Sequence, residues 1–240
     1  HRIVHISRVL VHRVNPAWSH PSHMEDNMAI QEALERRGLE KVSVESTPTG
    51  QIHAAWQVNT PVCVSIVIPT RDKVTYLRRC LESIRRLTPE IDYEIILIDT
   101  GSRQPETLAY YEKLKEWNRL IYLEDHAPFN YSRVNNLGAR RSQGDLLLFL
   151  NNDIEVLAST WLAELVRWAQ LPEVGVVGPQ LLFPDGTIQH AGIVMGVEGH
   201  ASHVFGGMQE HAAGPFGSAD WYRHYAAVPG ACMMLRRVVF

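Results

Sequence analysis

Apolar residues in the middle of the chain come in short unbroken runs, and more polar segments separate them. The runs predict strands over residues 62–68, 93–98, 120–123, 145–150 and 174–177. The segments between them predict helices over residues 74–87, 104–117, 132–143 and 161–168. Strands that are apolar throughout, rather than alternating, belong to a parallel sheet covered on both faces. The pattern therefore predicts an α/β fold with a mostly parallel sheet and helices on both faces.

The segments before and after these strands and helices have a different pattern of apolar and polar residues. Residues 1–25 predict a strand end and a loop, followed by a short helix with Asp26 as its N-cap and Gly38 just past its end. Residues 41–60 predict a linker with little core of its own. After residue 180, glycines and histidines crowd the chain and a second apolar stretch covers 226–235, which predicts loops and short antiparallel strands beside the parallel sheet.

Composition narrows the class of protein. The chain has 240 residues, of which 45% are apolar and 20% charged, as in soluble globular proteins. With 23 Lys and Arg against 26 Asp and Glu, its net charge of −3 gives no indication of a nucleic-acid partner. Three widely spread cysteines predict reduced thiols in a cytosolic protein. The sequence runs from His1 to Phe240 without a starting Met or a signal-peptide layout, so we expect a piece of a longer protein.

Polar residues stand where three of the predicted strands end. Thr70 and Asp72 follow the first strand, Asp99 follows the second, and 151–153 (Asn-Asn-Asp) follows the fourth. Each group alone is equally typical of a turn or a helix cap. In a parallel sheet, however, the carboxyl ends of neighbouring strands meet at one edge, where ligands bind. Three such groups together favour a binding site at that edge.

The chemistry of these groups suits a hard divalent cation. A carboxylate at the end of an apolar strand, such as Asp153, is costly to desolvate without a partner. One acid among oxygen donors fits Mg²⁺ or Mn²⁺ shared with the phosphates of a ligand. The sequence has no Gly-x-Gly-x-x-Gly loop, no Walker-type loop and no Gly-x-Ser-x-Gly elbow. These absences disfavour the nucleotide sites built on glycine loops and the α/β-hydrolases.

Several segments resemble a family-2 glycosyltransferase with the GT-A fold. The strongest are 64–72, 93–102 and 150–156, which are similar to the family's first strand and loop, its acidic nucleotide-binding loop and its Asp-x-Asp motif. Segment 129–145 is similar to the stretch that leads to the family's metal strand, and segments 184–192 and 230–234 are similar to the rhamnosyltransferase-like branch that builds O-antigens and related surface polysaccharides. The resemblance covers about residues 61–240. It departs from the family at Asn151, where the motif has its first Asp.

The resemblance implies roles for individual residues. Thr70, Asp72 and Asp99 would contact the nucleoside of a sugar donor, and Asp153 would hold Mn²⁺ or Mg²⁺ on its diphosphate. Further nucleotide contacts would come from Pro69, Gly101, Arg133, Asn136 and Asn152. Residues on the acceptor side would be His190, Gly230 and Ala231. No residue is identified as the catalytic base, since the family's acidic segment lies downstream; Asp220 has no motif to support it.

The expected function is metal-assisted, inverting transfer of a sugar from a UDP-, dTDP- or GDP-sugar to a saccharide or lipid-linked saccharide. We expect a cytoplasmic protein, and peripheral attachment to the inner membrane is the alternative location. Residues 1–60 would be the tail of a preceding domain, which can be another transferase, and a linker. Residues 61–240 would be a C-terminally truncated GT-A domain. The alternatives are an inactive nucleotide-sugar-binding or scaffold domain, and a nucleotidyltransferase, whose glycine- and arginine-rich loop is absent from 69–73.

Two other features invite a function. His200 and His203 have the spacing of metal ligands on a helix, but their glycine-rich surroundings favour solvated or locally hydrogen-bonded loop histidines over a zinc site. The arginine pairs at 140–141 and 236–237 are expected to be solvated or paired. Contact with an anionic membrane is the alternative for both pairs.

Overall fold

The computed structural model describes residues 23–46, 52–197, 199–214 and 217–240, and it divides into two compact units between Ala54 and Ala55. The first unit holds helix α1 (His23–Glu35), β1 (Ser43–Ser46) and all but the last residue of β2 (Ile52–Ala55), which pairs with β1 in a two-stranded sheet. Because α1 begins at His23, the prediction of Asp26 as its N-cap was wrong, whereas Gly38 follows its end with a φ of 83°. The strand expected before residue 23 lies outside the described residues.

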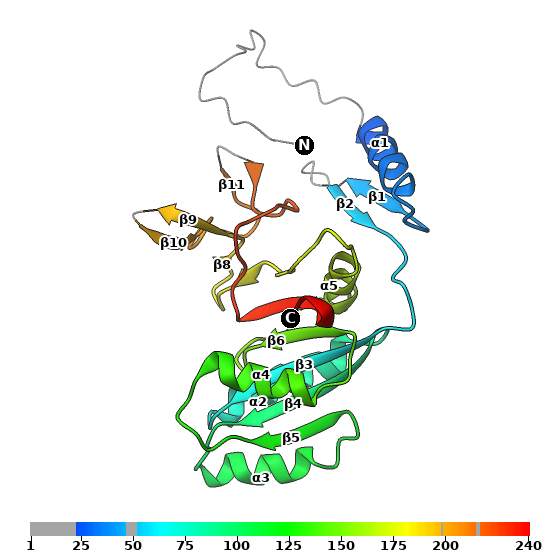
Figure 1. Cartoon of the computed structure of the whole chain (residues 1–240). Helices are drawn as coiled ribbons and strands as arrows, with labels where there is room; N and C mark the ends of the chain where they lie inside the picture. The colour runs from blue at the N-terminus through cyan, green and yellow to red at the C-terminus, as the bar shows by residue number, and fades with distance from the viewer. Residues whose placement is uncertain (1–22, 47–51, 198, 215–216) are drawn as a thin grey trace. The chain divides into compact units, whose positions relative to one another are not determined.

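The second unit is built on a five-stranded sheet in the order β13-β6-β3-β4-β5 (Figure 1). Its parallel strands are β3 (Cys63–Thr70), β4 (Asp92–Asp99), β5 (Leu120–Glu124) and β6 (Leu146–Leu150). Strand β13 (Cys232–Arg236) runs antiparallel to β6 at one edge. The predicted α/β class with a mostly parallel sheet is confirmed.

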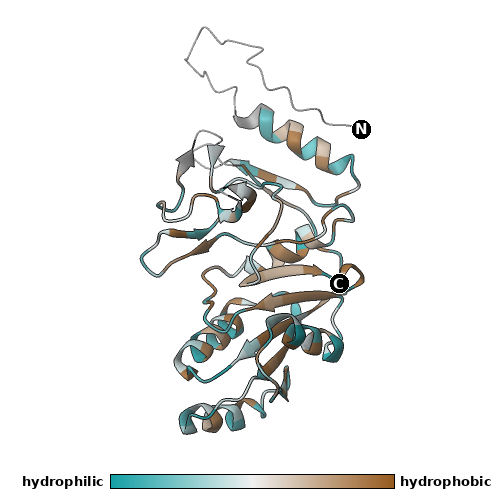
Figure 2. Cartoon of the chain, turned by 60° about the vertical axis from the view of Figure 1, so that its left-hand side comes forward, coloured by the Kyte–Doolittle hydropathy of each residue, from teal (hydrophilic) through white to brown (hydrophobic). Residues whose placement is uncertain are grey.

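Helices cover both faces of this sheet. Residues of α2 (Val74–Leu87), α3 (Pro105–Leu114) and α5 (Trp161–Ala169) share one core with Ile66 and its neighbours. Helix α4 (Tyr131–Arg141) packs on the other face against Val67 and its neighbours. Alternate strand residues therefore enter opposite cores, which is why the strands are apolar throughout and form the most hydrophobic part of the unit (Figure 2).

Short antiparallel pairs follow α5, as expected. We call residues 181–218 the hairpin region. It contains β7 (Leu181–Leu182), β8 (Ile188–His190), β9 (Ile193–Val197), β10 (His200–His203), β11 (Ala213–Gly214) and β12 (Gly217–Ser218). The strand predicted over 174–177 does not form: Val174 donates to the carbonyl of Leu171 in a turn, and only Val177 bridges to Met234 of β13.

The arginine pair at 236–237, where β13 gives way to the last turn, η1 (Arg237–Val239), caps helices. Arg237 donates to the carbonyls of Ala139 and Gly144 and to the Ser142 hydroxyl, at 2.8–2.9 Å, and so holds the end of α4. Arg236 does the same after α5, for the carbonyls of Ala169, Leu171 and Pro172. Both arginines are therefore paired with protein groups, which is one of the two states, solvated or paired, expected for them.

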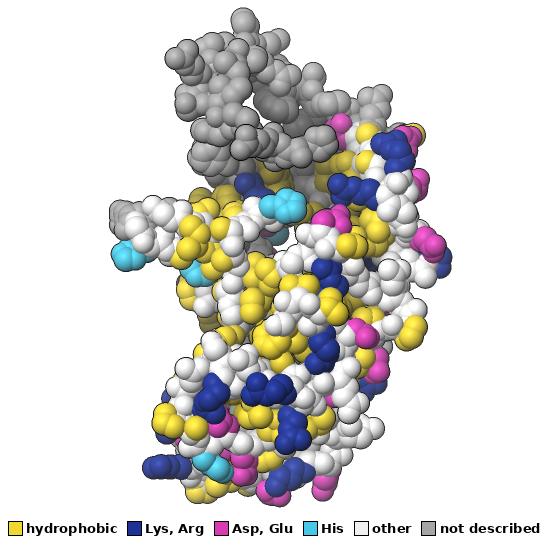
Figure 3. Space-filling model, in the orientation of Figure 1, with side chains coloured by type: hydrophobic (Ala, Val, Ile, Leu, Met, Phe, Trp, Pro, Cys, Tyr) yellow, Lys and Arg dark blue, Asp and Glu magenta, His cyan; other side chains and the backbone are white. Residues whose placement is uncertain are grey.

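Arg140 and Arg141 are exposed, and Lys and Arg side chains gather on the face that α4 covers (Figure 3). Among the residues that the structure describes, no helix is both long and apolar enough to cross a bilayer.

Candidate functional site

The carboxyl ends of β3 and β4 bring Thr70 and Asp99 together, because the two residues are partners in the parallel register. Asp99 is only 4% exposed, and its carboxylate accepts hydrogen bonds from the Ser102 N–H at 3.0 Å and the Ser102 hydroxyl at 2.6 Å. The hydroxyls of Tyr111 and Tyr122 lie 3.5 Å from the same carboxylate. All of these partners are neutral, so they hold the Asp99 carboxylate in place but do not offset its negative charge.

The two tyrosines stay protonated beside this carboxylate. Burial, with the nearby charge of Asp99, raises the pKa of Tyr111 to about 12. The same two causes raise the pKa of Tyr122. Both phenols are therefore hydrogen-bond donors at neutral pH.

Asp72 links the loop after β3 to the loop after β4. Its Oδ1 accepts the N–H groups of Arg103 and Gln104 at 2.8 and 2.9 Å, and these bonds, chiefly the one from Gln104, lower the pKa of its carboxyl. Its own N–H donates to the Ser102 hydroxyl. Asp72 does not cap α2, whose N-cap position is Lys73 with no side-chain bond. The helix-cap interpretation of 70–72 is thus wrong.

The loop after β6 joins the same edge. The Asn152 amide donates to the Thr70 hydroxyl at 2.9 Å, which ties the Asn-Asn-Asp segment to the end of β3. Asp153 is exposed, and its carboxylate forms no hydrogen bond or ion pair with any residue that the structure describes. The three predicted groups therefore meet at one rim, which we call the strand-end rim.

The donor set at Asp153 fits a cation that the ligand helps to hold. Nowhere in the described ranges do three His, Cys, Asp or Glu side chains form a metal-binding group. Mg²⁺ and Mn²⁺ do not need such a cage, because they keep waters and take the remaining ligands from substrate phosphates. An exposed, unpaired carboxylate flanked by asparagines suits that arrangement.

Asp125 is a rim residue that sequence reasoning missed. It follows β5 and is buried; its N–H donates to the Asp99 carbonyl at 2.8 Å, and Arg133 lies 2.6 Å from its carboxylate. The hydrogen bond from Arg133 lowers the pKa of Asp125. Its position at the carboxyl end of a predicted strand was the available signal.

The segment before α4 places the remaining predicted nucleotide residues. Arg133 also donates to the Pro128 carbonyl at 2.9 Å, so its guanidinium is held by the loop that precedes the helix. The N-cap of α4 is Asn130, which accepts the Arg133 N–H, and not Ser132 as predicted. Asn136 is exposed on α4. Pro69 precedes Thr70 in β3, and Gly101 lies in the loop after β4 with a φ of 95°.

The residues predicted on the acceptor side separate into two places. The Ala231 carbonyl accepts the Asn151 N–H at 2.9 Å, and the Gly230 carbonyl accepts the Tyr131 hydroxyl at 2.6 Å, so this segment borders the rim. His190 is 2% exposed in β8 and hydrogen-bonded to His203, with 2.9 Å between their Nδ1 atoms. The only aspartate after the Pro-Asp-Gly turn, at position 220, is paired with a histidine, His211.

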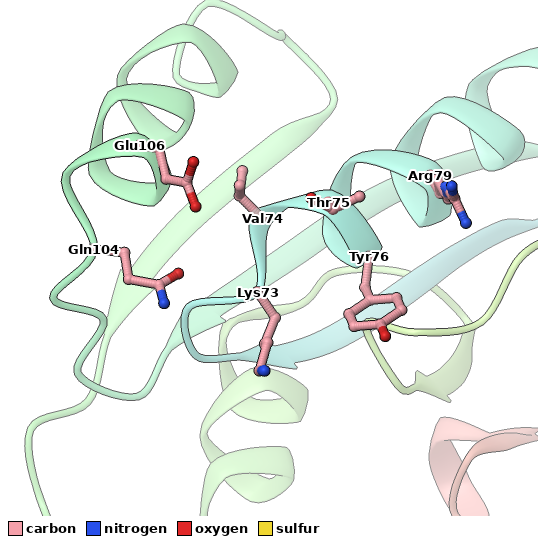
Figure 4. Close-up of a pocket in the computed structure, with 7 residues that line it drawn as sticks. All are labelled: Lys73, Val74, Thr75, Tyr76, Arg79, Gln104 and Glu106. Carbon is pink, nitrogen blue, oxygen red and sulfur yellow. The ribbon is translucent and has the colours of Figure 1, made fainter.

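A hollow of about 430 Å³ lies between the first turns of α2 and α3 (Figure 4). It is next to the Asp72 link but contains none of the predicted site residues. Its lining is Lys73, Val74, Thr75, Tyr76, Arg79, Gln104 and Glu106.

Comparison with known proteins agrees with this geometry. The family model described as "Glycosyl transferase family 2" matches residues 65–240. The chain belongs to that family. Over 215 residues it is 43% identical to the O-antigen biosynthesis protein RfbC of Myxococcus xanthus, a match that covers 88% of this chain and 16% of that protein. It is 38% identical to the uncharacterized protein y4gI of Sinorhizobium fredii, over all of this chain and 27% of that protein.

A solved structure shares the fold. The crystal structure of GalNAc-T7 with UDP, GalNAc and Mn²⁺ superposes with a TM-score of 0.59 at 19% identity, over 78% of this chain and 37% of that one. This supports the GT-A type of α/β fold. Family membership makes the protein a glycosyltransferase, while the chain spans less than a third of the two relatives described above.

Proposed function

We propose that this glycosyltransferase moves a sugar from a nucleoside diphosphate sugar to a saccharide hydroxyl during surface polysaccharide synthesis. The observation that carries the proposal is the strand-end rim. The Asn152 amide bonded to Thr70, and Thr70 paired with Asp99, bring the carboxylate of one strand and the Asn-Asn-Asp loop of another to one place. The similarity to an O-antigen biosynthesis protein supports the pathway.

On the donor side, we assign the nucleoside to Thr70, Asp72 and Asp99. The Asp99 carboxylate is fixed by neutral donors. Its Oδ1 accepts the Ser102 N–H and hydroxyl, whereas its Oδ2 has longer contacts, with the Ser102 N–H at 3.2 Å and the Tyr122 hydroxyl at 3.5 Å. We assign Oδ2 as the oxygen that accepts a further hydrogen bond from an N–H or O–H of a base or ribose. Arg133 acts through Asp125, since its guanidinium is already bonded there and at Pro128. It would shape the rim from one side.

On the phosphate side, we assign Asp153 as the protein's carboxylate ligand to Mn²⁺ or Mg²⁺. When bound there, a divalent ion would stabilise the charge that develops on the leaving diphosphate. The Mn²⁺ and UDP in the GalNAc-T7 structure support this assignment. The Asn152 side chain holds the loop at the end of β3, so the aspartate stays beside the nucleoside residues.

The proposed reaction is a displacement with inversion at the anomeric carbon. The acceptor oxygen bonds to that carbon as the bond to the diphosphate oxygen breaks, and the hydroxyl proton passes to a general base. No residue of this chain is assigned as that base. Because the relatives are several times longer, we also propose that a neighbouring transferase domain precedes residue 61. A cytoplasmic location remains a prediction.

Calorimetry with UDP, dTDP and GDP, each with and without Mn²⁺, tests the proposal. We expect one nucleotide to bind at least ten-fold more tightly with Mn²⁺, and Asp153→Ala to abolish that difference. Glu155→Gln is the matched control, because Glu155 is exposed in the same loop and its loss should change nothing.

Hydrolysis of the matching nucleotide sugar then separates the alternatives. Turnover supports a transferase site, whereas metal-dependent binding without turnover supports an inactive sugar-nucleotide-binding domain. If no nucleoside diphosphate binds with or without metal, both readings of the rim are wrong.

A further inference from the structure

The first turn of α4 contacts the strand-end rim at two separate points. On one side Arg133 pairs with Asp125, which follows β5. On the other side the Tyr131 hydroxyl donates to the Gly230 carbonyl at 2.6 Å, just before β13 at the opposite edge of the sheet. The start of α4 therefore reaches from one end of the rim to the other.

Tyr131 is itself held firmly. It is the first residue of α4, directly after the N-cap Asn130, whose side chain accepts the Arg133 N–H. The buried amide of Asn135, one turn later, donates to the Tyr131 carbonyl at 2.9 Å. These bonds fix the backbone from which the phenol projects, and the bond to the Gly230 carbonyl holds the hydroxyl of this partly exposed side chain.

The segment at 230–231 is held from both sides. The Gly230 carbonyl is bonded to Tyr131, and the Ala231 carbonyl accepts the N–H of Asn151, the first residue of the Asn-Asn-Asp loop. Tyr131 is thus linked through two consecutive peptide groups to the loop that carries Asp153. A substitution of Tyr131 should therefore loosen the segment at 230–231 without altering a hydrogen bond of Thr70, Asp72 or Asp99.

Gly230 is shaped to this contact. A Cβ atom at Gly230 would lie 2.6 Å from the Tyr131 hydroxyl oxygen, 3.0 Å from Cζ and 3.2 Å from Cε1. The backbone of Gly230 is outside the left-handed region, so alanine would fit its dihedral angles. The phenol occupies the space where a Cβ would stand, so a side chain at this position would displace the end of Tyr131.

We propose that Tyr131 is a positioning residue whose hydrogen bond to Gly230 holds the acceptor-side segment against the Asn151–Asp153 loop and so keeps water from the activated sugar. The proposal rests on the proposed function. In the side reaction a water oxygen bonds to the anomeric carbon, the bond to the diphosphate oxygen breaks, and the proton of water goes to solvent. Loosening the segment should favour this hydrolysis and leave nucleotide binding unchanged.

The first test is Tyr131→Phe, which removes only the hydroxyl. With the nucleotide that binds best in the presence of Mn²⁺, we expect the Kd to change less than two-fold. Amide hydrogen exchange over residues 226–231 should become faster, by about five-fold if the bond contributes as one net hydrogen bond. The kcat for hydrolysis of the matching nucleotide sugar should rise while its KM stays constant. Tyr76→Phe is the control, since Tyr76 is exposed and distant in sequence from the segment.

The second test is a double-mutant cycle. Gly230→Ala should by itself speed exchange over 226–231 and raise hydrolysis, because its Cβ displaces the phenol. In a Tyr131→Phe background the 2.6 Å contact is gone, so adding Gly230→Ala should cause little further change, and in Tyr131→Ala none. Additive effects of the two substitutions would refute the contact.

The outcomes separate the two proposals. If wild-type protein binds no nucleoside diphosphate, the proposed function fails, whatever Tyr131 does. If wild-type protein binds and hydrolyses donor but Tyr131→Phe leaves hydrolysis unchanged, the positioning role is wrong, even where exchange becomes faster. Faster exchange, raised kcat and unchanged nucleotide affinity together support it.

Discussion

The parallel sheet and the hairpin region hold their residues in place by different means. In the sheet, the central residues of β3, β4 and β6 are fully buried between helices, and long ladders of hydrogen bonds set the register. In the hairpin region, the strands are two to five residues long, and single close contacts shape the chain. At Gly192, for example, a Cβ would lie 2.2 Å from the ring of Tyr225.

This difference bears on the site. Of the residues assigned to the donor, Thr70 and Asp99 stand directly on strand ends and inherit the rigidity of the sheet, while Asp72 is held two residues after β3 by bonds to the next loop. The segment at 230–231 enters β13 from the less regular part of the chain, and it is fixed at the rim by bonds from Tyr131 and Asn151. Donor binding should therefore be robust to changes in the hairpin region, whereas acceptor use should be sensitive to them.

Gly144→Ala should destabilise the sheet more than any other change proposed here. A Cβ at Gly144 would lie 2.6 Å from the Ser65 hydroxyl and 2.7 Å from both the Cys63 carbonyl and the Ser65 nitrogen, which belong to the central strand and cannot yield. We expect a loss of about 3 kcal/mol in the free energy of unfolding, measured by urea denaturation. Gly175→Ala, where nothing lies within 4 Å of the added Cβ, is the control. Equal stability of the two variants would contradict this account of the sheet.

A smaller loss is expected from Arg237→Ala. Its guanidinium donates three hydrogen bonds to the end of α4 and the following loop, and their removal takes from the Gly144 carbonyl the bond it accepts from Arg237, while the Ala139 carbonyl keeps its bond from the Ser142 hydroxyl. The expected cost is about 2 kcal/mol, seen as a lower thermal midpoint. Arg140→Ala, at an exposed position of the same helix, should cost little. If Arg140→Ala were the more damaging change, the capping role would be wrong.

Most of the sheet could be predicted because the apolar runs match one physical requirement, burial on both faces. The apolar pattern gave wrong predictions where a local turn or a second suitable cap residue determined the structure. At 174–177 the apolar run continues the turn after α5, and only Val177 reaches the sheet. At the start of α4, Asn130 and Ser132 are both good cap residues, and a pattern of apolar positions does not choose between them.

The same reasoning explains what was predicted of the site. The meeting of Thr70, Asp99 and the Asn-Asn-Asp segment followed from strand ends sharing an edge. The links among loops did not, because they depend on backbone geometry that no periodicity encodes: Asp72 bonds to the loop before α3, and Tyr131 bonds to Gly230. Asp125 was predictable by the strand-end rule and was overlooked.

The smallest expected effect concerns the buried His190 in the hairpin region. The His190 Nδ1 accepts the Gly192 N–H at 3.3 Å and lies 2.9 Å from the His203 Nδ1. Burial, and then the nearby His203, lower the pKa of His190 to about 4. In the unfolded chain its pKa is near the ordinary value of about 6.5.

The sign of the pH dependence follows from these two values. Above about pH 6.5 neither state binds a proton at His190, and its contribution to stability is complete. As the pH falls toward 4, the unfolded chain binds a proton that the folded chain excludes, so stability decreases by about 1 kcal/mol between pH 7.5 and 5.5. Urea midpoints at the two pH values should converge in His190→Gln but not in His200→Gln, whose histidine is exposed in β10. Amide exchange should show the loss first over residues 187–204, while β3 and β4 stay protected; simultaneous loss in both regions would mean that the hairpin region is not the weaker part.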